Sequence, residues 1–181
     1  MTRIIISRIS TENFDGTSLD NFVLNQKVEK CWRMINGVYV LTSVSYTETW
    51  DFSERREMAL KILCAVEKGQ AAFGAVADGV TVGFALLGGS LFGRGGQYID
   101  LSEFYVSENF RRQGIGYRLF RKVCCEAKKL GAKRLYISAH SAEESINAYM
   151  KYGCSEAVEP DRAHIEKEPF DLQLEYDLSK L

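Results

Sequence analysis

The sequence predicts an α/β fold built as a mixed, mostly antiparallel sheet with helices on both faces. Two β-type runs flank Asp78-Gly79, the strongest hairpin signal in the chain, which indicates antiparallel pairing. A strand, an amphipathic helix and a second strand follow between residues 98 and 139, and this order predicts a right-handed crossover between parallel neighbours. The last strand, 170–178, alternates apolar and polar residues, as expected of an antiparallel strand with one buried and one wet face.

The first elements of the chain are predicted from apolar spacing. A short strand is expected over 3–9, and residues 37–45 are expected to be extended. Between them we predict a helix within 18–35, because apolar residues recur there at roughly helical spacing: Val23, Val28, Cys31, Trp32 and Ile35.

The next helix is better defined. It is predicted to begin after Asp51 or Ser53 and to end at Gly69, a residue suited to a left-handed cap. Its apolar stripe is Ala59, Ile62, Leu63 and Val66. The hairpin of 72–77 and 80–87 follows, and then a glycine-rich connection that is expected to be a plain flexible loop.

The second half begins with a strand over 98–107. Its helix is predicted to present Ile115, Leu119, Val123, Ala127 and Leu130 on one face and to stop at Gly131. A strand over 134–139 comes next, and Ser141-Ala142-Glu143-Glu144 has the pattern of a capping box that starts another helix. No repeat or linker divides the chain, so a single domain over 1–181 is expected.

Composition limits the possible partners and the cellular compartment. A net charge of -1 gives no broad electrostatic case for nucleic acid or a membrane surface. The apolar run near the N-terminus is shorter than a signal-peptide core, and no run is long enough to span a bilayer, so a cytoplasmic protein is expected. The five cysteines form no C-x-x-C pair and are expected to be reduced thiols, with no metal bound.

Function is indicated by the segment from Arg111 to Gly116, which reads Arg-Arg-Gln-Gly-Ile-Gly between the strand and its helix. The first N–H groups of a helix lack intrahelical partners and lie at the positive end of its dipole, so an anion is favoured there. Gly114 and Gly116 carry no side chain to keep a diphosphate away, and Arg111 and Arg112 add charge. A dinucleotide fingerprint or a P-loop would need glycines or a Gly-Lys-Ser/Thr sequence that are missing here.

This R-x-x-G-x-G segment resembles the acyl-CoA-binding motif of the GNAT N-acetyltransferases. The stretch from Ser145 to Cys154 is similar to the same family's A-x-x-x-Y-x-K-x-G-F motif, with Tyr149 and Gly153 at the matching positions. Two motifs in this order are more specific than either alone, and the resemblance is clear from about Gln70 to Tyr176.

The resemblance implies a GNAT-like fold in which a pair of parallel strands splays apart to admit the pantetheine arm of acetyl-CoA as acyl donor. It implies that the backbone of the first strand's end pairs with the pantetheine amides, and that the loop and helix start hold the diphosphate. The residues expected to bind the cofactor are Tyr105, Val106, Ser107, Arg111, Arg112, Gln113, Gly114, Ile115, Gly116 and Tyr117.

The resemblance also implies direct transfer of an acetyl group from sulfur to an amine, with Tyr149 as the acid that protonates the leaving thiolate. For the base, two acids are candidates, Glu103 and Asp100. They are an odd number of residues apart and would point to opposite faces of a regular strand, so a bulge would be needed to bring both into one site. Glu103 is preferred, and solvated structural carboxylates are the alternative. His140 is a third candidate, for which a structural role is the simpler reading.

Departures from the family pattern limit what carries over. The asparagine often found seven residues before the tyrosine is Ala142 here, and Cys154 stands in place of the usual phenylalanine. The acceptor is a small-molecule or peptide amine that the sequence does not identify. A non-catalytic acyl-CoA-binding domain is the main alternative, a purely structural domain the third, and a homodimer could form through the last strand.

Overall fold

The computed structural model describes residues 3–181; Met1 and Thr2, which begin the predicted N-terminal stretch, lie outside the described residues. Within 3–181, seven strands form one sheet in the order β1-β4-β5-β6-β7-β9-β8, and two others form a separate hairpin. The strands of the sheet are β1 (Ile4–Arg8), β4 (Ala72–Ala77), β5 (Val80–Leu87), β6 (Tyr98–Val106), β7 (Arg134–Ala139), β8 (Ser155–Glu156) and β9 (Leu172–Asp177). The separate hairpin consists of β2 (Asn25–Ile35) and β3 (Val38–Thr49).

The helices are α1 (Phe52–Glu67), α2 (Ile115–Lys129), α3 (Glu143–Tyr152) and the short α4 (Arg162–Lys167), with single 3₁₀ turns at Glu108–Phe110 and Leu178–Lys180. The pairing of β6 with β7 is parallel, and every other pairing in the described sheet is antiparallel. The predicted mixed, mostly antiparallel sheet is therefore confirmed. No helix within 3–181 is long and apolar enough to cross a membrane.

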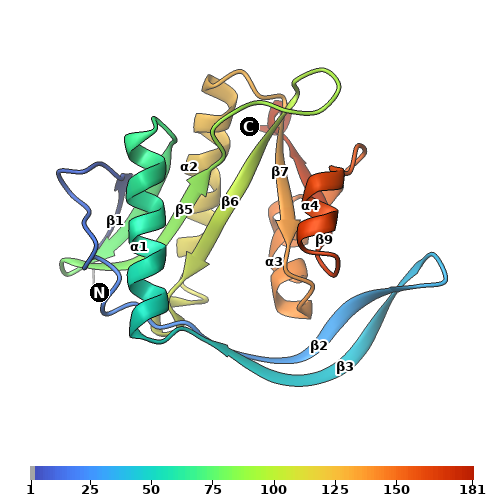
Figure 1. Cartoon of the computed structure of the whole chain (residues 1–181), viewed down its shortest axis with the longest axis horizontal. Helices are drawn as coiled ribbons and strands as arrows, with labels where there is room; N and C mark the ends of the chain where they lie inside the picture. Colours follow the sequence, from blue (N-terminus) through green and yellow to red (C-terminus); the bar gives the residue numbers. More distant parts are fainter. Residues whose placement is uncertain (1–2) are drawn as a thin grey trace.

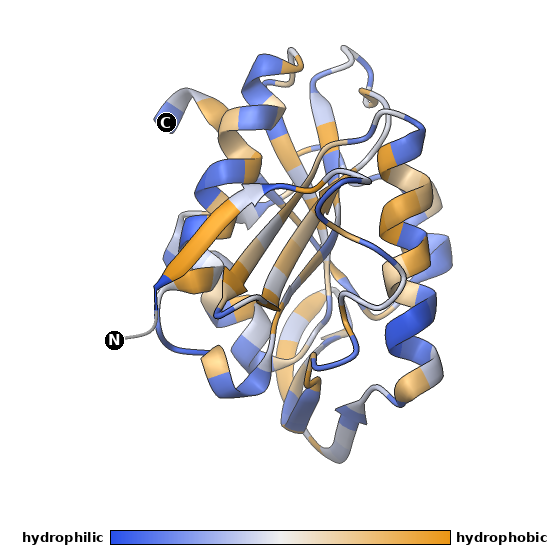
Figure 2. Cartoon of the chain, turned by 90° about the vertical axis from the view of Figure 1, so that its left-hand side faces the viewer, coloured by the Kyte–Doolittle hydropathy of each residue, from blue (hydrophilic) through white to orange (hydrophobic). Residues whose placement is uncertain are grey.

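Helices α1 and α2 cover opposite faces of the sheet, as Figure 2 shows from the side of β1. On one face Leu119, Phe120 and Val123 of α2 pack in the larger core cluster, together with buried residues of β4 to β7. On the other face Ala59 and Ile62 of α1 pack in a second cluster with residues of β4 and β5. Each strand of the centre therefore presents one side to α1 and the other to α2.

Several local predictions are confirmed by the backbone. Asp78 and Gly79 both have positive φ, as a tight hairpin turn requires, and Ala77 pairs with Val80 across it. Asp51 caps α1 through a reciprocal capping box with Glu54, and α1 ends just before Gly69. Residues 38–45 are extended, as predicted, and form part of β3, whereas Gly37 lies in the turn before it.

The helix predicted within 18–35 is wrong, because residues 25–35 form strand β2. The register between β2 and β3 shifts between Val28 and Lys30, so a bulge interrupts the regular alternation of side chains. As a result Val28 and Cys31, three residues apart, are buried in the same small cluster. Apolar residues three positions apart usually indicate a helix, and here the bulge produced this spacing in a strand.

Two smaller predictions in the second half are also wrong. Leu130 is 48% exposed, because α2 has already ended at Lys129 and Leu130 is its cap. Ala142, not Ser141, is the N-cap of α3, and no side chain caps that helix. Ser141 instead accepts a hydrogen bond at 2.6 Å from the Arg33 guanidinium of β2.

The last strand also departs from its predicted alternation. It spans 172–177 rather than 170–178, and its polar residues Gln173 and Glu175 are buried with the apolar ones. They remain inside because Tyr136 donates to Gln173 and Tyr98 donates to Glu175, each at 2.6 Å. The face of β9 that was expected to be exposed to solvent is therefore a buried polar layer under the segment that contains α4.

Candidate active site

The two parallel strands separate along their length. β6 and β7 pair only between Tyr98 and Asp100 on one side and Arg134 and Tyr136 on the other. Figure 1 shows the strands close together near the top and diverging toward the bottom, where the β2–β3 hairpin crosses below them. The hairpin is fixed there by the Trp32 N–H, which donates to the Ser141 carbonyl at 2.8 Å.

A cleft of about 1530 Å³ occupies the space between the separated strands. It runs from the loop at the start of α2 to α4 and the end of β3, and its walls include α1 and α3. It is lined by all three residues expected to be catalytic, Asp100, Glu103 and Tyr149, and by seven of those expected to bind the cofactor: Tyr105, Val106, Arg111, Arg112, Gly114, Gly116 and Tyr117. The cleft therefore brings together predicted site residues from β6, the loop before α2, α2 itself and α3.

The loop and first turn of α2 offer a row of free N–H groups. Arg112 and Gly114 both have positive φ, and Gly114 is the N-cap of α2. Within 3–181, the backbone N–H groups from Arg112 to Tyr117 have no hydrogen-bond partner, and the first bond of the helix is the one from the Arg118 N–H to the Gly114 carbonyl. Such a run of unpaired donors at a helix start is an anion site.

Side chains around this loop have distinct positions. Arg111 turns back to the protein, where its Nε donates to the Val106 carbonyl at 3.1 Å, and Gln113 donates to Asn109 at 3.1 Å. Arg112 is exposed, and Ile115 is buried under α2. Arg112 is thus the guanidinium of the pair that is free to approach an anion, while Arg111 fixes the shape of the loop.

The two glycines of the motif have different surroundings. A Cβ at Gly114 would have nothing within 4 Å, so that position faces open space. A Cβ at Gly116 would lie 2.8 Å from the Tyr152 hydroxyl. Gly114 therefore leaves room for a ligand, whereas Gly116 leaves room for the α3 tyrosine that closes the cleft wall.

The end of β6 is the edge expected to pair with pantetheine. Tyr105 and Val106 lie beyond the last residue that pairs with β7, so no strand covers their β7 side, and the Val106 carbonyl accepts from Nε of Arg111. Ser107 is buried, its N–H donates to Val82 and its carbonyl accepts from Phe110, each at 2.9 Å. The open edge available to a ligand therefore ends at Val106.

Tyr149 points into the cleft from α3. Its ring packs near Phe104 and Phe120, with centroids 5.9 and 6.5 Å away. Its hydroxyl has no hydrogen-bond partner within 3–181, and burial raises its pKa above the usual range of a phenol. Tyr149 is consequently a protonated donor at neutral pH that is not committed to another acceptor.

A bulge in β6 brings both candidate carboxylates into the cleft. The register with β5 shifts between the pairs Leu87–Leu101 and Leu86–Glu103, which leaves Ser102 as the extra residue. Phe104 and Val106 accordingly pack on the α2 side with Leu101. In a regular strand the even-numbered Asp100 would be expected to share their face, and because of the bulge this expectation is wrong. Glu103 instead points toward α1, where it forms an ion pair with Lys61.

Asp100 is held by two neighbours. It accepts from the Ser102 hydroxyl at 2.7 Å and lies 3.4 Å from Nε2 of His164 on α4. Asp100 and then Asp161 raise the pKa of His164 to about 9, so this imidazole is protonated at neutral pH. Asp100 therefore faces a cation, so it is less free than Glu103 to accept a proton from a substrate.

His140 lies at the end of β7 between the strands. Its Nε2 is 3.1 Å from the Tyr46 hydroxyl and 3.5 Å from Glu48, both from β3. His140 thus connects β7 to the hairpin, in keeping with the structural role expected for it. No group of three or more His, Cys, Asp or Glu within 3–181 is suited to a metal ion.

Two cleft residues had no place in the sequence-based site, His164 and Asp171. A third, Glu48, was expected only as an acid that could attract a cationic amine, with a scattered surface charge as the simpler explanation. Asp171 lies just before β9, accepts from Ser138 at 3.2 Å, and has a pKa raised by burial. A carboxyl group with a raised pKa is better suited to act as a base near neutral pH than an ordinary one. The sequence did not mark His164, because α4 was not predicted, and it did not mark Asp171, because that residue was assigned to the wet face of the last strand.

The cleft and its motif agree with comparisons to known proteins. A family model described as "Acetyltransferase (GNAT) family" matches residues 35–154. No curated protein matches the chain in sequence.

Solved structures share the fold at low identity. A nourseothricin acetyltransferase is 14% identical with a TM-score of 0.71, covering 97% of this chain and 98% of the other. A proposed streptothricin acetyltransferase from Bacillus anthracis, in complex with acetyl coenzyme A, is 15% identical with a TM-score of 0.68 and 96% coverage of both. The ribosomal-protein-S18-alanine N-acetyltransferase from Escherichia coli is 17% identical with a TM-score of 0.57, covering 97% and 94%. Since the family model spans well over half of its sequence, this protein belongs to the GNAT acetyltransferase family.

Proposed function

We propose that this protein transfers an acetyl group from acetyl-CoA directly to a primary amine. The observation that carries the proposal is the row of unpaired backbone N–H groups from Arg112 to Tyr117 at one end of the cleft, with Tyr149 uncommitted within it. The N–H groups suit the diphosphate of acetyl-CoA, and a structure that shares this fold was solved in complex with acetyl coenzyme A. The open backbone edge at Tyr105 and Val106 suits the pantetheine amides.

The residues then have the following roles. The amine, once deprotonated, attacks the thioester carbonyl carbon, so a C–N bond forms and the C–S bond breaks. Tyr149 donates its proton to the departing thiolate, which has an ordinary pKa near ~8.5. Glu103, directly or through a water molecule, accepts the proton that the amine loses, and Asp171 is the second candidate for this base. No acyl-enzyme is needed, in accordance with the absence of any cysteine from the lining of the described cleft.

Calorimetric titration with acetyl-CoA, using ADP and NAD as controls, tests the first step. Micromolar binding that is selective for acetyl-CoA is expected, because only acetyl-CoA fills both the N–H row and the strand gap. An assay for thiol release in the presence of a panel of primary amines then tests transfer. Tight acetyl-CoA binding without transfer to any amine would favour the non-catalytic acyl-CoA-binding domain, and no binding would refute both.

A further inference from the structure

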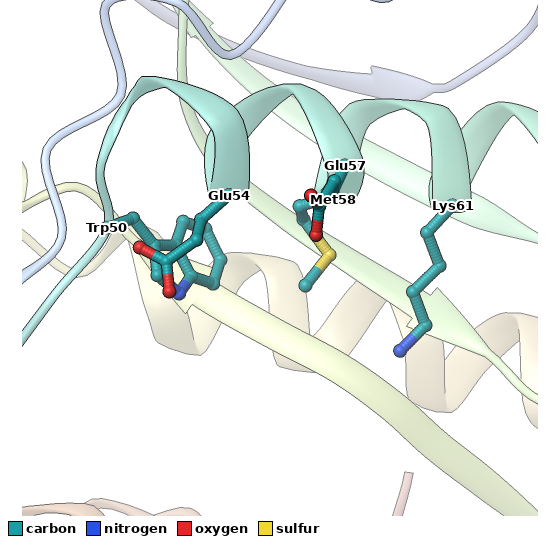
Figure 3. A pocket seen from close by; sticks show the side chains of 5 residues that line it. All are labelled: Trp50, Glu54, Glu57, Met58 and Lys61. Atoms are coloured by element: carbon teal, nitrogen blue, oxygen red, sulfur yellow. The ribbon is translucent and has the colours of Figure 1, made fainter.

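A second, smaller hollow adjoins the cleft along α1. It has a volume of about 260 Å³ and is lined by Trp50, Glu54, Glu57, Met58 and Lys61. Figure 3 shows these side chains extending from the same side of α1 and from the residue that precedes it. Trp50, Met58 and Lys61 also line the main cleft, so the two spaces share a wall.

The hollow lies on the side of β6 that an acceptor would approach. Glu103 and Tyr105 project toward α1, where Glu103 pairs with Lys61 and the Tyr105 ring lies 4.8 Å from that of Trp50. The opposite side of β6 packs against α2, whose N-terminus carries the proposed diphosphate site. If the donor occupies the α2 side and the strand gap, the acceptor reaches the thioester from the α1 side and passes the hollow.

The chemistry of the hollow suits a positive group. Glu54 uses its Oε2 to accept from the Asp51 N–H at 2.7 Å, and Glu57 uses its Oε1 to accept from the Ser53 hydroxyl at 3.3 Å. Each carboxylate keeps its other oxygen for a ligand. The indole of Trp50 offers an aromatic face, to which ammonium groups are attracted.

Nearby cations do not neutralise these two carboxylates. Lys61 is paired with Glu103. Arg55 points to the Phe22 carbonyl at 3.3 Å, and Arg56 forms an ion pair with Asp20 at 2.5 Å. The hollow therefore combines a cavity, an aromatic wall and two uncompensated negative charges within reach of Glu103.

We propose that this hollow binds a second cationic group of the acceptor, so that the preferred acceptor is an extended diamine or polyamine rather than a monoamine. The proposal rests on the proposed transfer to an amine and specifies its substrate class. One amino group reaches the thioester, while a second, protonated amino group lies against Trp50 between Glu54 and Glu57. The length of the acceptor then follows from the separation of the hollow and the thioester, and a monoamine leaves the hollow empty.

The first test compares cadaverine with pentylamine as acceptors, because they have the same length and differ by one amino group. The wild-type kcat/KM is expected to favour cadaverine. Glu57→Gln should reduce this preference about 3-fold, and the double variant Glu54→Gln/Glu57→Gln should reduce it on the order of 10-fold, as expected for losing one and two exposed ion pairs. Glutamine at position 54 still supports the capping box, so α1 is preserved.

The matched control is Glu67→Gln, which removes the same charge from the last turn of α1, away from the hollow. It should leave the preference for cadaverine unchanged. A wild-type enzyme that shows no preference, or a preference that survives in the double variant, would overturn the proposal. Failure of acetyl-CoA to bind would instead refute the proposed function, so the two failures are distinguishable.

A binding measurement covers the case in which acetyl-CoA binds and no amine in the panel is acetylated. The chain has two tryptophans, so Trp32→Phe leaves Trp50 as the only fluorescent indole. Spermidine is expected to change the Trp50 emission of this variant in the presence of CoA, and to do so about 10-fold more weakly after the double substitution. An unchanged Trp50 emission, or equal affinity in both backgrounds, would overturn the proposed hollow site.

Discussion

Replacing Tyr149 with phenylalanine tests the proposed chemistry most directly, because it removes one hydroxyl and little else. The ring packs with Phe104, Phe120 and Tyr152, and these contacts remain in the variant. The hydroxyl has no partner within 3–181, so its removal leaves no buried acceptor unpaired. The free energy of unfolding should therefore change by no more than about 0.5 kcal/mol.

The expected kinetic effect is much larger. General-acid catalysis contributes roughly 10²-fold or more, so kcat should fall about 100-fold, equivalent to ~2.7 kcal/mol of transition-state stabilisation. The affinity for acetyl-CoA should be unchanged, because the Tyr149 hydroxyl is not part of the row of backbone N–H groups proposed to bind the diphosphate. Since burial raises the pKa of Tyr149, the wild-type enzyme should also show no loss of kcat attributable to this donor below about pH 10.

Steady-state assays of thiol release, paired with calorimetric titration and thermal unfolding, measure these three quantities. Tyr176→Phe is the matched control, since this buried tyrosine also packs on Phe120, at 5.3 Å, yet does not line the cleft. Its kcat should remain at the wild-type level. An undiminished kcat in Tyr149→Phe would remove Tyr149 from the mechanism, and a fall in kcat accompanied by an equal loss of acetyl-CoA affinity would mean that it binds cofactor instead.

Three further predictions concern the rest of the cleft. Gly114→Ala strains a residue at φ 78° by about 1–2 kcal/mol and redirects the free N–H groups, so the affinity for acetyl-CoA should fall at least ~10-fold. The control is Gly37→Ala, at φ 80° in the β2–β3 turn, which should cost similar stability and leave the affinity for acetyl-CoA, measured by calorimetry, intact. Glu103→Gln should lower kcat/KM about 100-fold if Glu103 is the base, whereas a normal Glu103→Gln and an impaired Asp171→Asn would transfer that role to Asp171. His164 has a folded-state pKa of about 9, so its ion pairs contribute their full stability below about pH 6.5 and lose it as the pH rises through 9. His164→Gln should therefore lower Tm more at pH 6 than at pH 9.5, and an equal lowering at both values would contradict the protonated pair.

Much of the site's framework was predictable because it depends on local signals. The hairpin at Asp78-Gly79 and the α2 start at Gly114 both rest on backbone conformations that few other residues adopt easily. The diphosphate loop and Tyr149 are placed by short motifs within single elements. By contrast, the residues on the proposed acceptor side of the cleft come from β3, α4 and the start of β9. Tertiary packing brings them together, and no local sequence pattern predicts it.

The β2–β3 hairpin explains one departure from the family pattern. Ala142 stands where an asparagine is often found, and it is 2% exposed against Cys31, with which it forms a β-bridge. A larger side chain at this position would have to displace the hairpin that crosses the open end of the cleft. The hairpin that supplies Gln26 and Glu48 to the cleft therefore also constrains the start of α3.

One error of sequence interpretation and one alternative that the sequence left open have the same physical origin, a bulge in a strand. In β2 a bulge buried Val28 and Cys31 together, and the resulting spacing of three predicted a helix. In β6 a bulge at Ser102 placed Asp100 and Glu103 in the same cleft, although an odd separation puts residues on opposite faces of a regular strand. The sequence of β6 shows this bulge, because the residues that face the core lie at odd positions before it, Ile99 and Leu101, and at even positions after it, Phe104 and Val106.

A change of parity in apolar alternation is thus a usable signal of a bulge, provided that the run is known to be a strand. In β6 the flanking hairpin and crossover identify the run as a strand, so the bulge could be predicted from the sequence. In β2 no flanking signal existed, and the same pattern was compatible with a helix. The bulge in β6 also has a consequence for function: by turning Glu103 toward Lys61 and α1, it aims the proposed base at the side from which the acceptor arrives, while Phe104 and Val106 keep the strand anchored to α2.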